Sequence, residues 1–182
     1  MTSTLSQSKS TAASPAQRAL STAPNSGRAW WFLGTLAVLR NPEGAPRTPA
    51  VIELTIPPGG SPPRHIHDAL DDSFLMLDGE VIIRCGDRTF VAHPNDYVVL
   101  PAGVEHTFRV TSAQAARMLL VHATDEFLNF IEAVGTPAAK LELPATDHGI
   151  NRDSLIRIAA EHELRIVGAP LEQSDVDCGA VS

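Results

Sequence analysis

Short apolar runs separated by turn-forming residues fill the middle of the chain. Residues 50–56 alternate, with Ile52, Leu54 and Ile56 on one face and polar side chains on the other, as in a half-buried strand. Strands are predicted at 29–39 (one or two strands), 50–56, 73–77, 80–85, 88–92, 97–100, 106–110 and 116–123. Their regular spacing, with turns such as Asp78-Gly79 between them, favours an all-β sandwich or barrel.

The apolar pattern changes to a helical one after residue 123. Residues 125–134 carry Phe127, Phe130 and Ile131 at helical spacing, and residues 153–164 form a second short helical pattern. The sequence therefore predicts an all-β fold with one or two short C-terminal helices.

The chain has room for one domain, because it is 182 residues long. Residues 1–27 are rich in Ser, Thr, Ala and Pro without apolar periodicity, which predicts a disordered arm, with a transit peptide as the alternative. We expect the folded domain to cover residues 28–168. Residues 169–182 are polar and acidic, and we expect a flexible tail.

Composition narrows the expected partners and location. The net charge of −7 argues against binding to nucleic acid or to an anionic membrane surface. No apolar run approaches the roughly 20 residues of a membrane span. The two cysteines, Cys85 and Cys178, do not form a disulfide framework, so a reducing, cytoplasmic location is expected.

Three histidines and an aspartate are the candidate metal ligands of the chain. His65 and His67 are two residues apart, so in a strand their side chains point to the same face. Asp71 and Asp72 follow, and His106 begins a later strand. Imidazole and carboxylate together suit a mononuclear transition-metal site. The other four histidines, including His122 in the last predicted strand, are expected to be surface or structural residues.

The same segments resemble the cupin superfamily. The first family motif has Gly, five residues, His-x-His, three or four residues, Glu, six residues and Gly. Gly59, His65, His67, Asp72 and Gly79 follow this order and spacing, with Asp72 in place of Glu.

The second motif has Gly, five residues, Pro-x-Gly, two residues, His, three residues and Asn. Residues 101–103 and His106 match it, whereas Asn95 stands at the first Gly and Val110 at the final Asn. The flanking segments, with Trp30-Trp31-Phe32 before the motifs, look like the single-domain quercetin-dioxygenase-like cupins. With these flanks the resemblance covers roughly residues 29–168.

The resemblance implies a double-stranded β-helix, or jelly roll, that usually dimerises and holds one divalent transition metal inside the barrel. It makes His65, His67 and His106 metal ligands. Asp72 would be the carboxylate ligand and the acceptor of the substrate's proton. Its side chain is one methylene, about 1.5 Å, shorter than that of glutamate, so either the backbone moves inward or Asp72 acts from outside the ligand shell.

Strand alternation predicts which residues line a substrate pocket, and the family resemblance predicts an activity. If the histidines face the barrel, strand alternation makes either Phe74 and Met76 or else Leu75 and Leu77 the pocket wall. Phe108 shares the face of His106, and we take Phe74, Met76 and Phe108 as the candidate pocket residues. The expected function is that of a metal-dependent dioxygenase for a small aromatic or enolic substrate. The alternatives are a metal-dependent cyclase or isomerase of a polyketide-like substrate, and a small-molecule-binding protein without catalysis.

Overall fold

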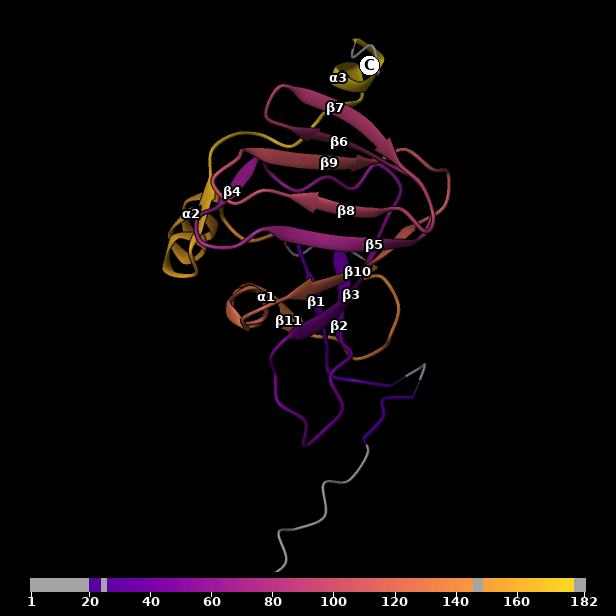
Figure 1. Ribbon diagram of the computed structural model, residues 1–182, viewed down its shortest axis with the longest axis vertical. Coiled ribbons are helices and arrows are strands. Elements are labelled where there is room, and N and C mark those ends of the chain that lie inside the picture. Colours follow the sequence, from indigo (N-terminus) through magenta and orange to yellow (C-terminus); the bar gives the residue numbers. More distant parts are fainter. Residues whose placement is uncertain (1–19, 24–25, 146–148, 179–182) are drawn as a thin grey trace, which may run out of the picture.

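Two antiparallel β-sheets face each other in a computed structural model that describes residues 20–23, 26–145 and 149–178 (Figure 1). The larger sheet has the order β11 (Thr136–Pro137), β1 (Ala29–Phe32), β2 (Thr35–Leu39), β3 (Ala50–Ile56), β10 (Ala116–His122), β5 (Asp72–Asp78) and β8 (Tyr97–Leu100). The smaller sheet has the order β12 (Leu164–Ile166), β4 (His65–His67), β9 (His106–Val110), β6 (Val81–Cys85) and β7 (Arg88–Ala92). This is the predicted all-β, jelly-roll-like fold.

Three helices complete the described structure: α1 (Glu126–Val134), α2 (Arg152–Glu161) and α3 (Gln173–Cys178). Helix α2 begins where Asn151 accepts hydrogen bonds from the backbone N–H groups of Asp153 and Ser154, a typical N-cap. None of the described helices has the length and apolar character needed to cross a membrane.

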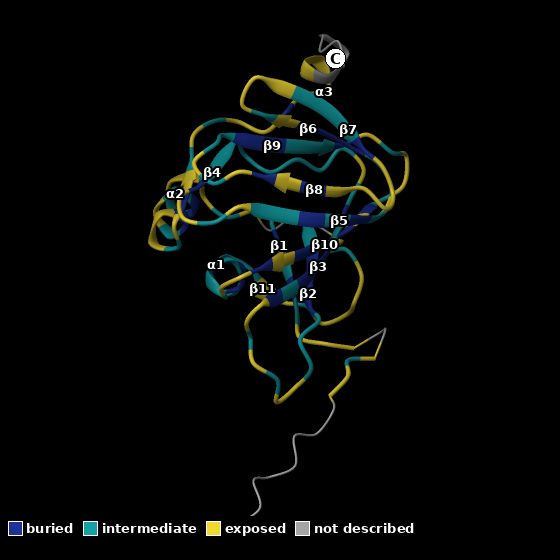
Figure 2. Ribbon diagram, in the orientation of Figure 1, coloured by how far each residue is buried: buried dark blue, intermediate teal, exposed yellow. Residues whose placement is uncertain are grey.

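The core lies between the sheets, because alternation along the strands turns every second side chain inward. Figure 2 shows the resulting mixture of buried and less buried positions along the strands. On β3, Ile52, Leu54 and Ile56 point inward and are at most 6% exposed. The inward face of β10 carries Ala116, Met118, Leu120 and His122. Because β3, β10 and β5 are neighbours, their inward-facing apolar residues form one continuous wall, and His122 lies at the end of β10.

The predicted second helix is wrong at its C-terminal end. Helix α2 stops at Glu161, and Glu163 has φ of +57°, a left-handed conformation that ends the helix. Leu164–Ile166 form strand β12, which pairs with β4 and so lies directly beside the histidine strand. The short strand β11 was also not predicted. Both pairings are long-range contacts that local apolar spacing does not reveal.

The predicted domain boundaries stay predictions. Residues 1–19 of the expected arm lie outside the described part of the chain. Within the expected tail, Leu171 is buried, its N–H donates to Ser61 Oγ, and its carbonyl accepts a hydrogen bond from Arg109. Helix α3 follows it.

Candidate metal centre

The His-x-His segment forms β4, a three-residue strand between β12 and β9. As predicted, His65 and His67 share one face, and their ring centroids are 5.2 Å apart. The backbone N–H of Gly103 donates to the carbonyl of His67 over 2.8 Å and ties the loop of the second motif to this strand. The two imidazoles are thus held by pairing on both sides of a very short strand.

His106 is brought to the same place by strand pairing. It is the first residue of β9 and stands opposite His65 in the antiparallel ladder, with 4.4 Å between the two ring centroids. His106 is 1% exposed. Histidines from the two sequence motifs therefore converge inside the protein.

Asp72 completes the cluster from the other sheet. It is the first residue of β5, and its Oδ2 lies 3.8 Å from His106 Nε2 and 4.0 Å from His67 Nε2. One potential ligand atom from each of His65, His67, Asp72 and His106 can be chosen so that all lie within 4.8 Å of one another. Ligands at about 2.1 Å from an ion are roughly 3 Å apart when adjacent and 4.2 Å apart when opposite, so modest contraction would complete a shell.

Unpaired buried atoms support this fit. His67 Nε2 and His106 Nε2 are buried without a hydrogen-bond partner among the described residues, which is costly unless a ligand satisfies them. In contrast, Nδ1 of His65 lies 2.8 Å from the carbonyl of Pro63, and Nδ1 of His106 lies 2.9 Å from that of Val104. These carbonyls accept the Nδ1 protons and leave each Nε2 lone pair free for a metal. The structure thus contains a three-histidine, one-aspartate site capable of binding a metal ion.

The charge states of His65, His67 and Asp72 also suit a cation. Burial, together with the nearby His106 and His67, lowers the pKa of His65 to about 3. Burial lowers the pKa of His67 to about 4, although the Asp72 carboxylate opposes that shift. Burial by itself would raise the pKa of Asp72, but His122, His67 and His106 hold it below the usual value. At neutral pH, His65 and His67 are therefore neutral imidazoles and Asp72 is a carboxylate, the forms that bind metals.

The metal-free protein should lose stability as the pH falls from about 6.5 to 4. In this window the unfolded chain protonates His65 and His67, whereas the folded chain keeps them neutral, so the unfolded state binds more protons. Thermal melting of metal-free protein should show a steady fall in Tm over this range. The double variant His65→Gln, His67→Gln should have a flatter profile, and a flat wild-type profile would contradict the prediction.

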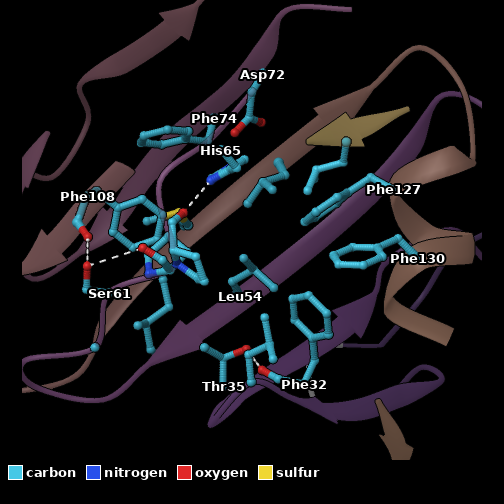
Figure 3. Close-up of a pocket in the computed structure, with 18 of the residues that line it drawn as sticks. Phe32, Thr35, Leu54, Ser61, His65, Asp72, Phe74, Phe108, Phe127 and Phe130 are labelled. Atoms are coloured by element: carbon cyan, nitrogen blue, oxygen red, sulfur yellow. Dashed lines mark hydrogen bonds between the residues drawn. The ribbon is translucent and has the colours of Figure 1, made fainter. Parts of the chain in front are cut away.

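An apolar cavity of about 250 Å³ adjoins the cluster (Figure 3). His65, His67 and Asp72 contribute to its wall. Five of the six phenylalanines of the chain line it: Phe32, Phe74, Phe108, Phe127 and Phe130. A cavity of about 150 Å³ holds benzene, so this one admits a substituted ring or a small fused pair.

Two of the three predicted pocket residues line this cavity. Phe74 and Phe108 do so, whereas Met76 does not. Met76 shares the inward face of Phe74 but is two residues further from Asp72, about 7 Å along the strand. It is fully buried and pairs with Met118 in the core. The expectation for Met76 is therefore corrected from pocket wall to core.

The sequence analysis did not predict that His122 lies beside Asp72. Its Nε2 lies 3.3 Å from Asp72 Oδ1, and its ring stacks on Phe127 with 4.9 Å between centroids. A usable signal was its spacing of two and four residues after the inward-facing Leu120 and Met118. Of the other histidines, His93 is exposed, His162 contacts Glu126, and His148 lies outside the described residues.

Asn95, which replaces a motif glycine, has a structural explanation. Its φ is +76°, in the left-handed region where asparagine is the best tolerated residue after glycine. The turn between β7 and β8 is therefore kept despite the substitution. Val110, which replaces the motif asparagine, is buried at 2% exposure in the core.

Asp72→Glu should keep one bound metal per chain, with an affinity equal to that of the wild type or tighter. The extra methylene extends the carboxylate by about 1.5 Å toward the imidazoles, which compensates for the present 3.8–4.0 Å separations. Isothermal titration with Co²⁺ would measure affinity and stoichiometry. A clear loss of binding would mean that the pocket is built around the shorter acid.

The central segment of the chain matches a known protein family. Residues 52–122 match the family model described as Cupin domain. The comparison with curated proteins found no match. Among solved structures, the Cnp3 cupin domain of Schizosaccharomyces pombe is 19% identical with a TM-score of 0.45, and the likeness covers 57% of this chain and 70% of that one.

Two further solved structures are similar at the same level. A protein of Thermus thermophilus is 26% identical with a TM-score of 0.42, over 53% of this chain and 83% of that chain. A Silicibacter pomeroyi protein described as a sugar phosphate isomerase from a cupin superfamily is 22% identical with a TM-score of 0.44, over 48% and 58%. The segment 52–122, which matches the family model described as Cupin domain, contains all four residues of the cluster.

Proposed function

We propose that this protein is a metal-dependent oxygenase of the quercetin-dioxygenase-like type that acts on a small aromatic or enolic molecule. The observation that carries the proposal is the position of the three-histidine, one-aspartate cluster at the wall of an apolar cavity lined by phenylalanines. Three imidazoles and one carboxylate suit a divalent transition metal and leave further coordination positions open. A metal bound there would supply Lewis acidity and, if redox-active, electron transfer with dioxygen.

Asp72 is suited to accept a proton from the substrate. Its side chain lines the cavity, and its pKa is held below the usual value, so it is ionised at neutral pH. A phenol or enol that enters the cavity with its hydroxyl toward the cluster would place the acidic proton beside this carboxylate. Removal of that proton makes the substrate more electron-rich, which favours its oxidation.

The wall of the cavity favours a neutral, ring-shaped substrate. Aromatic and aliphatic side chains dominate it, and no arginine or lysine occurs among the described lining residues. A phosphate or free carboxylate group would therefore enter without a cationic partner, which is unfavourable in an apolar space. Phenyl rings such as those of Phe74 and Phe127 instead offer stacked or edge contacts to a planar molecule.

The first experiment is metal analysis of protein purified without a histidine tag. The metal-free protein is then loaded anaerobically with Fe²⁺, Mn²⁺, Co²⁺ or Ni²⁺, and oxygen uptake is followed first with phenols and enols of one ring or a small fused pair and then with the larger flavonols. We expect one metal per chain and substrate-dependent uptake that Asp72→Asn strongly reduces. Turnover without oxygen uptake, especially with Zn²⁺, would replace the proposal with a cyclase or isomerase. Ligand binding without turnover for any metal would indicate a binding protein.

A further inference from the structure

A fourth histidine lies behind the carboxylate of the candidate metal site. His122 is the last residue of β10, and it is 4% exposed. Strands β10 and β5 pair with Leu120 opposite Phe74. Extending this antiparallel register by two residues places His122 opposite Asp72, with both side chains on the inward face.

The two oxygens of Asp72 face different neighbours. Oδ1 lies 3.3 Å from His122 Nε2, whereas Oδ2 lies 3.8 Å from His106 Nε2 and 4.0 Å from His67 Nε2. Both Oδ1 and His122 Nε2 are buried and have no aligned hydrogen bond among the described residues. The pair meets the distance for a hydrogen bond but not its alignment, so a small rotation of either side chain would complete it.

The His122 ring is itself held in place. It stacks on Phe127 of α1 with an interplanar angle of 20° and 4.9 Å between centroids. The ring of His67 lies 6.0 Å away, tilted by 33°. His122 thus has a fixed environment from which to direct a donor at Asp72.

We infer that His122 is a positioning residue whose Nε2–H donates to Asp72 Oδ1 and directs Oδ2 toward the metal-ligand imidazoles. An unrestrained aspartate could rotate its carboxylate, and ordering it on metal binding would cost affinity; a hydrogen bond to one oxygen reduces this cost. The inference rests on the proposed metal site. A role as a further ligand is less consistent with the geometry, because His122 is not part of the group whose donor atoms all lie within 4.8 Å.

The first test is the tautomer of His122 in the metal-free full-length chain. Long-range ¹H–¹⁵N correlation spectra distinguish a protonated from an unprotonated ring nitrogen. We expect the proton on Nε2 of His122, and on Nδ1 of His65 and His106, whose Nδ1 atoms face carbonyls. A neutral His122 with its proton on Nδ1 would overturn the inference, because Nε2 would then be an acceptor facing the carboxylate.

The second test is Co²⁺ titration of variants. His122→Phe keeps a flat ring against Phe127 but removes the donor, so affinity should fall about 10–100-fold while saturation stays at one metal per chain. His122→Gln restores an N–H donor and should recover affinity to within about threefold of the wild type. His93→Phe makes the same change at an exposed histidine and should have no effect. Melting curves show whether each variant is folded.

A double-mutant cycle with Asp72 shows whether His122 affects metal affinity by positioning the carboxylate or only by packing. In an Asp72→Asn background, His122→Phe should no longer weaken Co²⁺ binding further, because the carboxylate through which it acts is gone. An undiminished effect in that background would overturn the inference, as would unchanged affinity of His122→Phe alone. Loss of all binding by His122→Phe would make His122 a ligand. If the wild type binds no metal, the proposed function fails, and the tautomer still decides the role of His122.

Discussion

His106→Ala should abolish stable metal binding while the fold survives. His106 contributes the Nε2 atom of the second motif, and this atom is buried without a partner among the described residues. Removing one of three imidazoles leaves an incomplete shell, so we expect at least about a 100-fold loss of Co²⁺ or Mn²⁺ affinity. Metal analysis after gel filtration and isothermal titration would measure the loss, and far-ultraviolet circular dichroism would report on the fold.

A matched substitution controls for the general effect of losing an imidazole. His93→Ala removes an exposed histidine on the turn after β7 and should leave metal stoichiometry unchanged. His106 is 1% exposed, so its removal also leaves a small cavity and some loss of Tm is expected. Unchanged metal stoichiometry in folded His106→Ala protein would remove this residue from the ligand set.

Gly79→Ala should be among the most destabilising single substitutions in the chain. Gly79 has φ of +76°, and a residue with a Cβ adopts this left-handed backbone conformation only with steric strain. A Cβ would also lie 2.7 Å from the Cα of Ala116 and 2.9 Å from Ser112 Oγ. Because the first of these contacts is with backbone, we expect a loss of about 2–4 kcal/mol in the free energy of unfolding. Urea unfolding at pH 7 would measure it.

Gly44→Ala separates the two causes of this effect. Gly44 has a similar φ of +80°, but a Cβ there would have no atom within 4 Å. Its replacement therefore reports the backbone strain alone, about 1 kcal/mol. Equal destabilisation at both positions would mean that the predicted clash at the turn between β5 and β6 is relieved by local movement.

Most of the strand positions could be predicted, because strand formation leaves a local pattern. The alternation over Ala50–Ile56 and the apolar runs at Arg88–Ala92 and His106–Val110 match the observed strands in full. Strand β12 could not be predicted in this way. Its three residues follow a helix and continue that helix's apolar spacing, and only pairing with β4 makes them a strand.

The candidate ligands could also be predicted, because the two motifs carry their spacing in the sequence. The sequence could not place Asp72 relative to the imidazoles, since the side chain is shorter than the motif's glutamate. The structure places its Oδ2 within 4.0 Å of two of them. Nor could the sequence distinguish Phe74 from Met76: both lie on the inward face, and only depth along β5 decides which one lines the cavity.

Local sequence pattern specifies which side chains share a face of each strand, where most of the turns occur and which residue types are available for binding a metal. These are local properties with a period of two residues. Pairing in the folded chain places His65 opposite His106 in the ladder and His122 beside Asp72, and no local pattern specifies either of these contacts. The physical reason is register, because a shift between paired strands leaves each strand's own pattern intact but changes every neighbour across the sheet.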